Sequence, residues 1–294
     1  MRVFHTPSRR IFAFFLYTGF TLFCLAIILP FLHVIALSLS TKKAYFEGKV
    51  LFWPVDWYTK PYAIILTSKV FLTSLRNTVL IVVVNTSLQI FFALCAGYAL
   101  ANKHFFGTKV AFIYILIPMY FGGGLIPFYL IVNSYGLNNR LGALVFPYLV
   151  SIFYIIIFRN AINQLPKEIM ESAEMDGASE FTTLFRIVVH LIMPMIMAFT
   201  IFSAVGYWNM WFPVLIFIRD KWKWTLQYML RDIYTNPGIG AGPLEGMIDD
   251  PLQQLLPQNI IMASIICTIA PIIVIYPFLQ RYFIHGVIRG AVKG

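Results

Sequence analysis

Five acidic residues are concentrated in one short stretch of this 294-residue chain, which carries only 12 Asp and Glu in all. They are Glu168, Glu171, Glu174, Asp176 and Glu180. Carboxylates in the first turns of a helix complement the positive charge at its N-terminal end. Pro166 suits the first position of such a helix, and Gly177 can adopt the left-handed conformation that ends it. The stretch therefore predicts a short acidic helix.

A second helix is predicted directly after the first. Ser179 is a candidate N-cap, and apolar residues recur after it at helical spacing. These are Phe181, Leu184, Phe185 and Val188. From the residues alone, two interpretations are equally supported: an ordinary solvated loop with good helix caps, or a surface on which a partner acts.

The other reactive residue types are scattered along the chain. Cys24, Cys95 and Cys267 lie in separate apolar runs without metal or redox spacing, and the 5 His show no metal spacing either, so no metal site is predicted. No Gly-x-Ser-x-Gly, His-Glu-x-x-His or Gly-x-x-x-x-Gly-Lys-Ser/Thr run occurs. We therefore expect a non-enzyme that binds no cofactor itself and obtains any ATP-derived energy from a partner.

The composition is that of a membrane protein. Hydrophobic residues make up 60% of the chain and charged residues only 12%, whereas a soluble domain carries roughly 25% charged side chains. The net charge of +10 could suggest nucleic acid, but the basic residues stand between apolar runs rather than on one patch. They are better explained by membrane topology, so lipid is the expected surrounding and nucleic acid is not an expected partner.

Uncharged windows predict an all-α membrane protein with six transmembrane helices, because about 20 apolar residues span the hydrocarbon core. The first window is too long for a signal peptide and is expected to be retained. The predicted spans cover about 11–37, 77–100, 110–131, 141–159, 187–217 and 259–281 of a single domain, 1–294.

Orientation is predicted from the first helix, because Lys and Arg counts are equal on the two sides. Arg2, Arg9 and Arg10 precede that helix without an acidic residue, which favours a cytosolic N-terminus. Six spans return the C-terminus to the cytosol. The loop 160–186, with the acidic cluster, is then cytosolic, and the loop 219–257 is external.

The run from Leu165 to Ala178 resembles the "EAA" loop of bacterial binding-protein-dependent ABC import permeases, with Glu171-Ser172-Ala173 in place of Glu-Ala-Ala. In that family the loop forms a coupling helix that docks on a cytosolic ATPase. The resemblance implies that Glu171 meets a basic residue of the ATPase, that Ala173 allows close packing and that Asp176-Gly177 shapes the turn. The implied coupling set is completed by Ser172 and Ala178.

One position departs from the family pattern. Val189-His190 stands where the family usually has Leu-Pro, although the following proline is kept as Pro194. We therefore expect the fifth helix to enter the membrane with a milder bend.

Two further segments extend the resemblance. Residues 135–142 look like the family's loop before helix four, and residues 283–294 closely resemble the C-terminal signature of the maltose-type carbohydrate permeases. The resemblance implies a bacterial inner-membrane importer for an oligosaccharide, within a subgroup serving complex or uronate-containing oligosaccharides such as alginate. It also implies a second homologous permease, two ATPase subunits that use ATP and Mg, and an extracytoplasmic sugar-binding protein.

An outer aromatic group is the candidate substrate path: Tyr207, Trp208, Asn209 and Trp211. Its rings could stack on sugars and its amide could bind hydroxyls, but an interfacial aromatic belt is the competing interpretation. Helix three, interrupted by Pro118, Gly122–Gly124 and Pro127, indicates either a cavity wall or close glycine packing.

The external loop offers two more candidates. Pro237, Gly238, Gly240 and Gly242 mark a flexible loop, and a loop at this position reaches the binding protein in maltose-type permeases; a mere connector is equally supported. Lys221, Lys223 and Arg231 either attract an acidic sugar or anchor helix ends at headgroups.

Other transport classes remain alternatives at this point. An ion-coupled transporter usually carries a carboxylate or Lys within its spans, and none of the six windows does. A channel, or a permease for another substrate class, is compatible with the composition alone.

Overall fold

The computed structural model describes residues 7–102, 107–235 and 257–291, and all regular structure in these residues is helical. The predicted all-helical class is therefore confirmed. Within these described ranges, four helices are long and apolar enough to cross a membrane, and two sharply bent helix pairs raise the number to six if each pair is one span. The chain forms two compact units, Met1–Ser68 with Asp232–Ala270 and Lys69–Arg231 with Pro271–Gly294.

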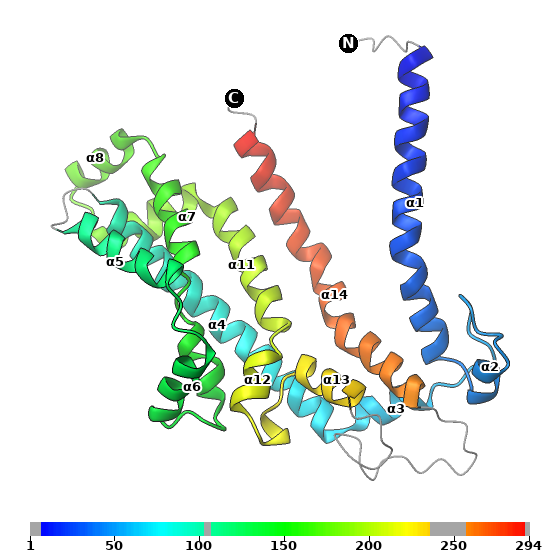
Figure 1. The fold of residues 1–294 in the computed structure, drawn as a ribbon. Coiled ribbons are helices and arrows are strands. Elements are labelled where there is room, and N and C mark those ends of the chain that lie inside the picture. Colours follow the sequence, from blue (N-terminus) through cyan, green and yellow to red (C-terminus); the bar gives the residue numbers. More distant parts are fainter. Residues whose placement is uncertain (1–6, 103–106, 236–256, 292–294) are drawn as a thin grey trace. The chain divides into compact units, whose positions relative to one another are not determined.

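The first unit is built around the end of the first long helix. Its helices are α1 (Pro7–Ser38), α2 (Lys42–Phe46), α3 (Lys60–Thr67) and the first part of α14 (Pro257–Ala291) (Figure 1). The Asn259 amide of α14 is fully buried and donates to the carbonyls of Leu37, at 2.7 Å, and Ser40, at 3.0 Å. Because carbonyls at a helix end lack partners within the helix, this amide satisfies the end of α1.

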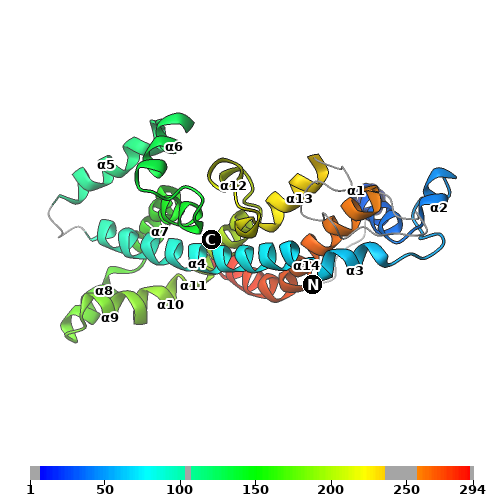
Figure 2. The ribbon, with the colours of Figure 1, turned by 90° about the horizontal axis from the view of Figure 1, so that it is seen from below.

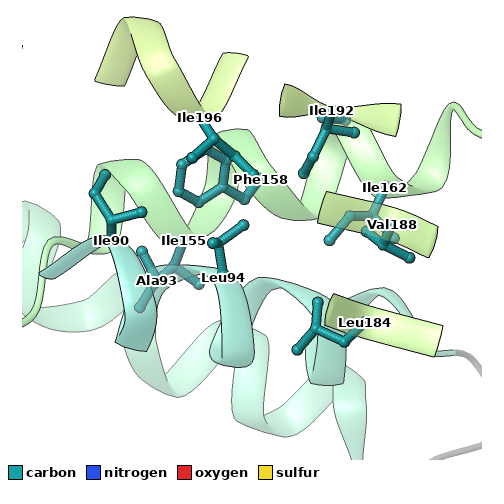
Figure 3. Packing of buried hydrophobic residues seen from close by; sticks show 11 residues of the cluster. Ile90, Ala93, Leu94, Ile155, Phe158, Ile162, Leu184, Val188, Ile192 and Ile196 are labelled. Atoms are coloured by element: carbon teal, nitrogen blue, oxygen red, sulfur yellow. The ribbon is translucent and has the colours of Figure 1, made fainter. Parts of the chain in front are cut away.

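The second unit centres on α4 (Lys69–Ala101), which packs against α7 (Ile152–Asn163) and α11 (Met193–Trp208) (Figure 1, Figure 2). Figure 3 shows the apolar cluster at this junction, where Phe158 and Val188 are fully buried. The remaining elements of the unit are α5 (Thr108–Tyr120), α6 (Leu125–Ser134), η1 (Leu141–Leu144), η2 (Phe146–Tyr148), α8 (Lys167–Met175), α9 (Glu180–Thr182), the π-helical turn η3 (Thr183–Val188), α10 (Val189–Leu191), α12 (Phe212–Phe217), η4 (Lys221–Lys223) and α13 (Leu226–Thr235), which runs on into the first unit.

Glycine lies in the break of one bent pair, and proline lies in the first turn of the helix that follows the other break. The axes of α5 and α6 differ by 113°, and Gly124 at the start of α6 has a left-handed φ of 80°. Pro118, in contrast, lies inside α5. The helix before Ile192 and α11 differ by 84°, so the milder bend expected from His190 is wrong. Pro194 stands at the start of α11, and a proline ring is incompatible with an uninterrupted helix through the preceding turn.

Two predicted helical windows are less regular than the sequence indicates. The window 141–159 begins with the 3₁₀ turns η1 and η2, and α7 starts only at Ile152. The window 187–217 contains α10, α11 and α12, with a second break at Asn209–Trp211. These irregular stretches leave backbone carbonyls that need partners, since lipid supplies none.

Candidate functional site

The acidic stretch folds into the predicted short helix, α8, with Pro166 as its N-cap rather than its first residue. Gly177 adopts a φ of 73°, which confirms the predicted left-handed end. Its N–H donates to Glu174 at 3.0 Å, and the N–H of Ala178 donates to Ala173 at 3.0 Å. These two bonds form a Schellman motif, which satisfies the last carbonyls of α8.

The face of α8 that carries the acids is exposed, whereas one small residue is buried. Ala173 is only 5% exposed, while Glu171, Glu174 and Asp176 are exposed. Ala173 therefore packs within this chain itself. Its methyl side chain is small enough to be buried against the rest of the chain, whereas the carboxylates of α8 remain exposed.

The segment after α8 is tied to α4. Ser179 accepts a hydrogen bond from the Thr182 N–H at 3.3 Å, which confirms it as the N-cap of α9. The Tyr98 hydroxyl of α4 donates to the Glu180 carboxylate at 2.5 Å. A change in the position of α9 would therefore act directly on the end of α4.

The end of α4 is also held by a residue that the sequence places at the end of a span. Arg159 donates from Nε to the Leu100 carbonyl at 3.0 Å, and its guanidinium carbon lies 4.2 Å from the Phe112 ring centroid. A positive charge near the C-terminus of a helix interacts favourably with the carbonyl groups that are exposed there. Arg159 thus links α4, α5 and α7.

A cavity of about 360 Å³ lies beside the α11–α12 junction. Three of the four predicted path residues, Tyr207, Asn209 and Trp211, line it, together with Tyr154 and other side chains. Trp208 does not line it: this residue is 6% exposed, and its indole N–H has no hydrogen-bond partner among the described residues. The aromatic group is therefore split between a cavity wall and the protein interior.

A buried polar network around Gln89, which was not among the predicted site residues, supports this cavity. The Gln89 carbonyl oxygen accepts from the Ser203 hydroxyl at 2.7 Å, and its amide donates to the Tyr207 hydroxyl at 2.8 Å and the Tyr148 carbonyl at 3.2 Å. The Tyr207 hydroxyl donates to the same carbonyl at 2.6 Å. Gln89 is a polar residue in the middle of the predicted span 77–100, and this position was the signal that could have identified it.

A second network of hydrogen bonds joins Asn139, in the loop before η1, to the stretch 217–223 after α12. Asn139, with a φ of 57°, donates its N–H to Phe217 at 2.8 Å. Its side-chain oxygen accepts from the N–H groups of Arg219, at 3.2 Å, and Asp220, at 3.0 Å. Its own carbonyl accepts from the Lys223 ammonium at 2.9 Å. Asn139 therefore fixes the stretch 217–223 to the loop before η1.

Lys223 is engaged on a second side as well. Its ammonium lies 3.3 Å from the Asp220 carboxylate. The pKa of the Asp220 carboxyl lies below its ordinary value. The main cause is the hydrogen bond from the backbone N–H of Trp222, and Lys223 contributes further. Lys223 is thus part of the local structure of this segment.

The predicted binding-protein contacts Pro237, Gly238, Gly240 and Gly242 lie outside the described residues. Among the described residues, no group of three or more His, Cys, Asp or Glu is arranged to hold a metal ion.

Comparison with known proteins gives consistent results. Residues 89–289 match the family model described as binding-protein-dependent transport system inner membrane component. The chain is 37% identical to protein LplC of Bacillus subtilis, covering 91% of this chain and 90% of LplC. It is 31% identical to the polygalacturonan/rhamnogalacturonan transport system permease protein YtcP of the same organism, covering 98% and 100%.

A solved structure is similar over almost the whole chain. It is the crystal structure of a bacterial ABC transporter involved in the import of the acidic polysaccharide alginate. The TM-score is 0.88 at 27% identity, covering 96% of this chain and 99% of the other.

Proposed function

Because this chain belongs to the inner membrane components of binding-protein-dependent transport systems, we propose that it is the membrane-spanning subunit of an ATP-driven oligosaccharide importer. The substrate class is an acidic oligosaccharide built from uronates, such as a fragment of alginate or polygalacturonan. It passes from a binding protein into the cytosol by alternating access. The acidic helix α8, whose end is fixed at Gly177, is the observation that carries the proposal.

The coupling role belongs to α8 and the turn after it. Glu171 pairs with a basic residue of the ATPase, and Ser172 lies next to it on the exposed part of the helix. Ala173 and Ala178 maintain the shape of the helix end through their mutual backbone bond, and Asp176 with Gly177 forms the turn that enters the docking groove. Movement of this segment would reach α4 through the Tyr98–Glu180 hydrogen bond.

The substrate class is supported by the relatives. YtcP is described as a polygalacturonan/rhamnogalacturonan permease, and the similar solved transporter imports alginate. Polyuronates of this kind carry a carboxylate on many of their sugar units. The cavity offers rings for stacking, from Tyr207 and Trp211, and the Asn209 amide for hydroxyl groups.

The assembly consists of this chain, a second homologous permease, two ATPase subunits that use ATP and Mg, and an extracytoplasmic sugar-binding protein. It sits in the bacterial inner membrane with both termini of this chain in the cytosol. The segment Pro237–Gly242 contacts the binding protein. The single domain 1–294 spans the membrane six times, with the loop 160–186 inside and the loop 219–257 outside.

The proposal is tested by reconstituting the assembly in liposomes with its binding protein and a labelled uronate oligomer. We expect uptake that requires both ATP and the ATPase subunits. Flux through this chain in the absence of the ATPase would indicate a channel, and ATP-driven uptake restricted to another substrate class would remove the sugar assignment.

Two sets of variants test the assigned residues in the same assembly. Gly177→Pro should abolish the stimulation of ATPase activity by the sugar-loaded binding protein, and unchanged stimulation would contradict the coupling role. Asn209→Ala and Trp211→Ala should lower uptake without lowering basal ATPase activity. Transport by both at the wild-type rate would favour the aromatic belt. Trp208→Ala is expected to act through lost packing, since Trp208 is buried.

A further inference from the structure

The loop 41–57 follows the first long helix and closes back onto its end. It contains α2 and the stretch after it, and Figure 1 shows that stretch turning back alongside α1. The Ser40 hydroxyl accepts from the Val55 N–H at 3.0 Å, and the Leu39 carbonyl accepts from the Tyr58 N–H at 2.8 Å. The loop is therefore a closed structure with a defined position at the end of α1.

A small apolar core holds the loop against α1. Ala44 and Val50 are buried, and they cluster with Ala36 and Leu37 at the end of the helix. The large apolar side chains of the loop are exposed instead: Phe46, Leu51, Phe52, Trp53 and Trp57. Trp53 is 80% exposed and Leu51 is 62% exposed. A group of exposed apolar side chains of this size marks a surface for a protein partner or a membrane.

The level of the loop along α1 is set by a contact with His33. The Nδ1 atom of this residue lies 2.7 Å from the Leu51 carbonyl oxygen. His33 stands five residues before Ser38, the last residue of α1. At 1.5 Å per residue, Leu51 is level with a point about 7 Å back from the end of the helix. The loop thus returns toward the membrane instead of leading away from it.

The length of the apolar part of α1 shows which layer of the bilayer this point occupies. The span Ile11–Ser38 has 28 residues, which at 1.5 Å per residue is a length of about 42 Å. A bilayer measures about 40–45 Å with its headgroup regions and about 30 Å without them. When the span is centred, its ends lie about 6 Å outside the hydrocarbon. Leu51 therefore lies where hydrocarbon meets headgroups, and Trp53, two residues later, is of the type enriched in that layer.

The charges of the loop suit lipid headgroups. Lys43 and Lys49 share one carboxylate, that of Glu47, at N–O distances of 3.9 and 2.7 Å. The loop carries three Lys against two acidic residues, so it stays positive after this pairing. Lysines near a membrane surface are attracted to anionic headgroups, while their apolar stems lie along apolar surface.

From the level, the exposed apolar side chains and the charge, we infer that the loop 41–57 is a membrane-surface anchor in which Leu51 and Trp53 insert among the headgroups of an anionic lipid leaflet. A soluble binding protein or a sugar in the water would meet the loop beyond the end of α1, not at the level of His33. The anchor fixes the depth of α1 in the membrane. His33, a polar residue near the end of an apolar span, holds Leu51 at this level.

The test places a nitroxide spin label in the loop, through Leu51→Cys or Trp53→Cys in a chain whose three native cysteines are replaced by Ala. The complete assembly is reconstituted in liposomes that contain phosphatidylglycerol. Collisions of the label with oxygen, which concentrates in hydrocarbon, are compared with collisions with a water-soluble nickel chelate. Oxygen collisions should prevail at both positions. Lys43→Cys provides the matched control in the same loop, because the Lys43 side chain is charged and 80% exposed, so nickel collisions should prevail there.

Prevailing nickel collisions at positions 51 and 53 would overturn the inference, because the loop would then project into water. Protection from both reagents, or a loss of oxygen collisions when the sugar-loaded binding protein is added, would overturn it as well, because a protein would then cover the loop. Exchange of phosphatidylglycerol for phosphatidylcholine should lower the oxygen-to-nickel ratio at position 53, and an unchanged ratio would refute the role of the lysines. Basal ATPase activity reports that each labelled assembly is intact.

Discussion

Replacement of Gln89 by Leu tests whether the buried network holds the helices around the cavity together. Gln89 makes three hydrogen bonds, to Ser203, Tyr207 and the Tyr148 carbonyl, and thereby joins α4, η2 and α11. Leu has a similar volume and keeps the apolar packing, so the change removes mainly these bonds.

The expected cost follows from the bonds that are lost and those that remain. Side-chain hydrogen bonds inside membrane proteins contribute about 0.6 kcal/mol each on average, which gives about 2 kcal/mol for three. The Tyr148 carbonyl keeps its bond from the Tyr207 hydroxyl, and Ser203 can turn to a carbonyl of its own helix. Little further penalty is expected, and about 2 kcal/mol corresponds to a fall of roughly 4–8 °C in the unfolding midpoint.

The measurement is the thermal unfolding midpoint of the assembled transporter, with Ser87→Leu as the control. Ser87 is on the same helix but exposed, so its replacement should leave the midpoint within about 1 °C of the wild type, as surface changes generally do. A double-mutant cycle of Gln89→Leu with Ser203→Ala should show a coupling of about 0.6 kcal/mol. An unchanged midpoint in Gln89→Leu, or a cycle without coupling, would refute the reasoning.

Three further predictions concern the contacts around α8 and the flanking segment. Tyr98→Phe removes the hydrogen bond to Glu180 and should reduce sugar-stimulated ATPase activity while basal activity is retained; equal loss of both would indicate misassembly. Gly177→Ala should reduce the same stimulation, because a left-handed conformation costs a non-glycine residue about 1–2 kcal/mol, and Gly177→Asn should reduce it less; equal effects would exclude backbone strain as the cause. Asn139→Gly keeps the positive φ but removes the side-chain oxygen that accepts from the N–H groups of Arg219 and Asp220, so amide hydrogen exchange at these two residues should accelerate. Asn139→Asp keeps an acceptor oxygen and should leave the exchange rates at the wild-type level.

Local rules were enough to predict the acidic helix and the residue at which it ends. The left-handed end at Gly177 and the cap at Ser179 both depend on residues within a few positions of each other. The break near Gly122–Gly124 could be predicted for the same reason, since three consecutive glycines disfavour a continuous helix.

Features that depend on distant residues could not be predicted. Gln89 bonds to residues 59 to 118 positions away, and nothing in the neighbouring sequence specifies those partners. The sharp bend at Ile192 was underestimated because His190 stands where the family pattern has a proline, whereas Pro194 alone is sufficient to start a new helix. Helix α13 was assigned to a loop because its apolar side is too short to form a membrane window.

The side-chain amides of Asn77, Asn85 and Gln89 in α4 all donate to backbone carbonyls, which explains their presence in an apolar helix. Asn77 donates to the carbonyls of Trp222 and Trp224, Asn85 to that of Leu144 and Gln89 to that of Tyr148. All four carbonyls belong to stretches where regular α-helix is interrupted or absent.

Irregular backbone at membrane depth persists only when protein or a water-filled cavity satisfies its polar groups. The side-chain amides of α4 donate hydrogen bonds to these polar groups. The irregular stretches lie beside the cavity wall, where Gln227 of α13 contacts Asn209. Substitutions at Asn85 are therefore expected to alter transport although Asn85 does not line the cavity, because the Leu144 carbonyl would lose the partner that holds η1 in place. We therefore expect the shape of the cavity to depend on α4 as much as on the aromatic residues that line it.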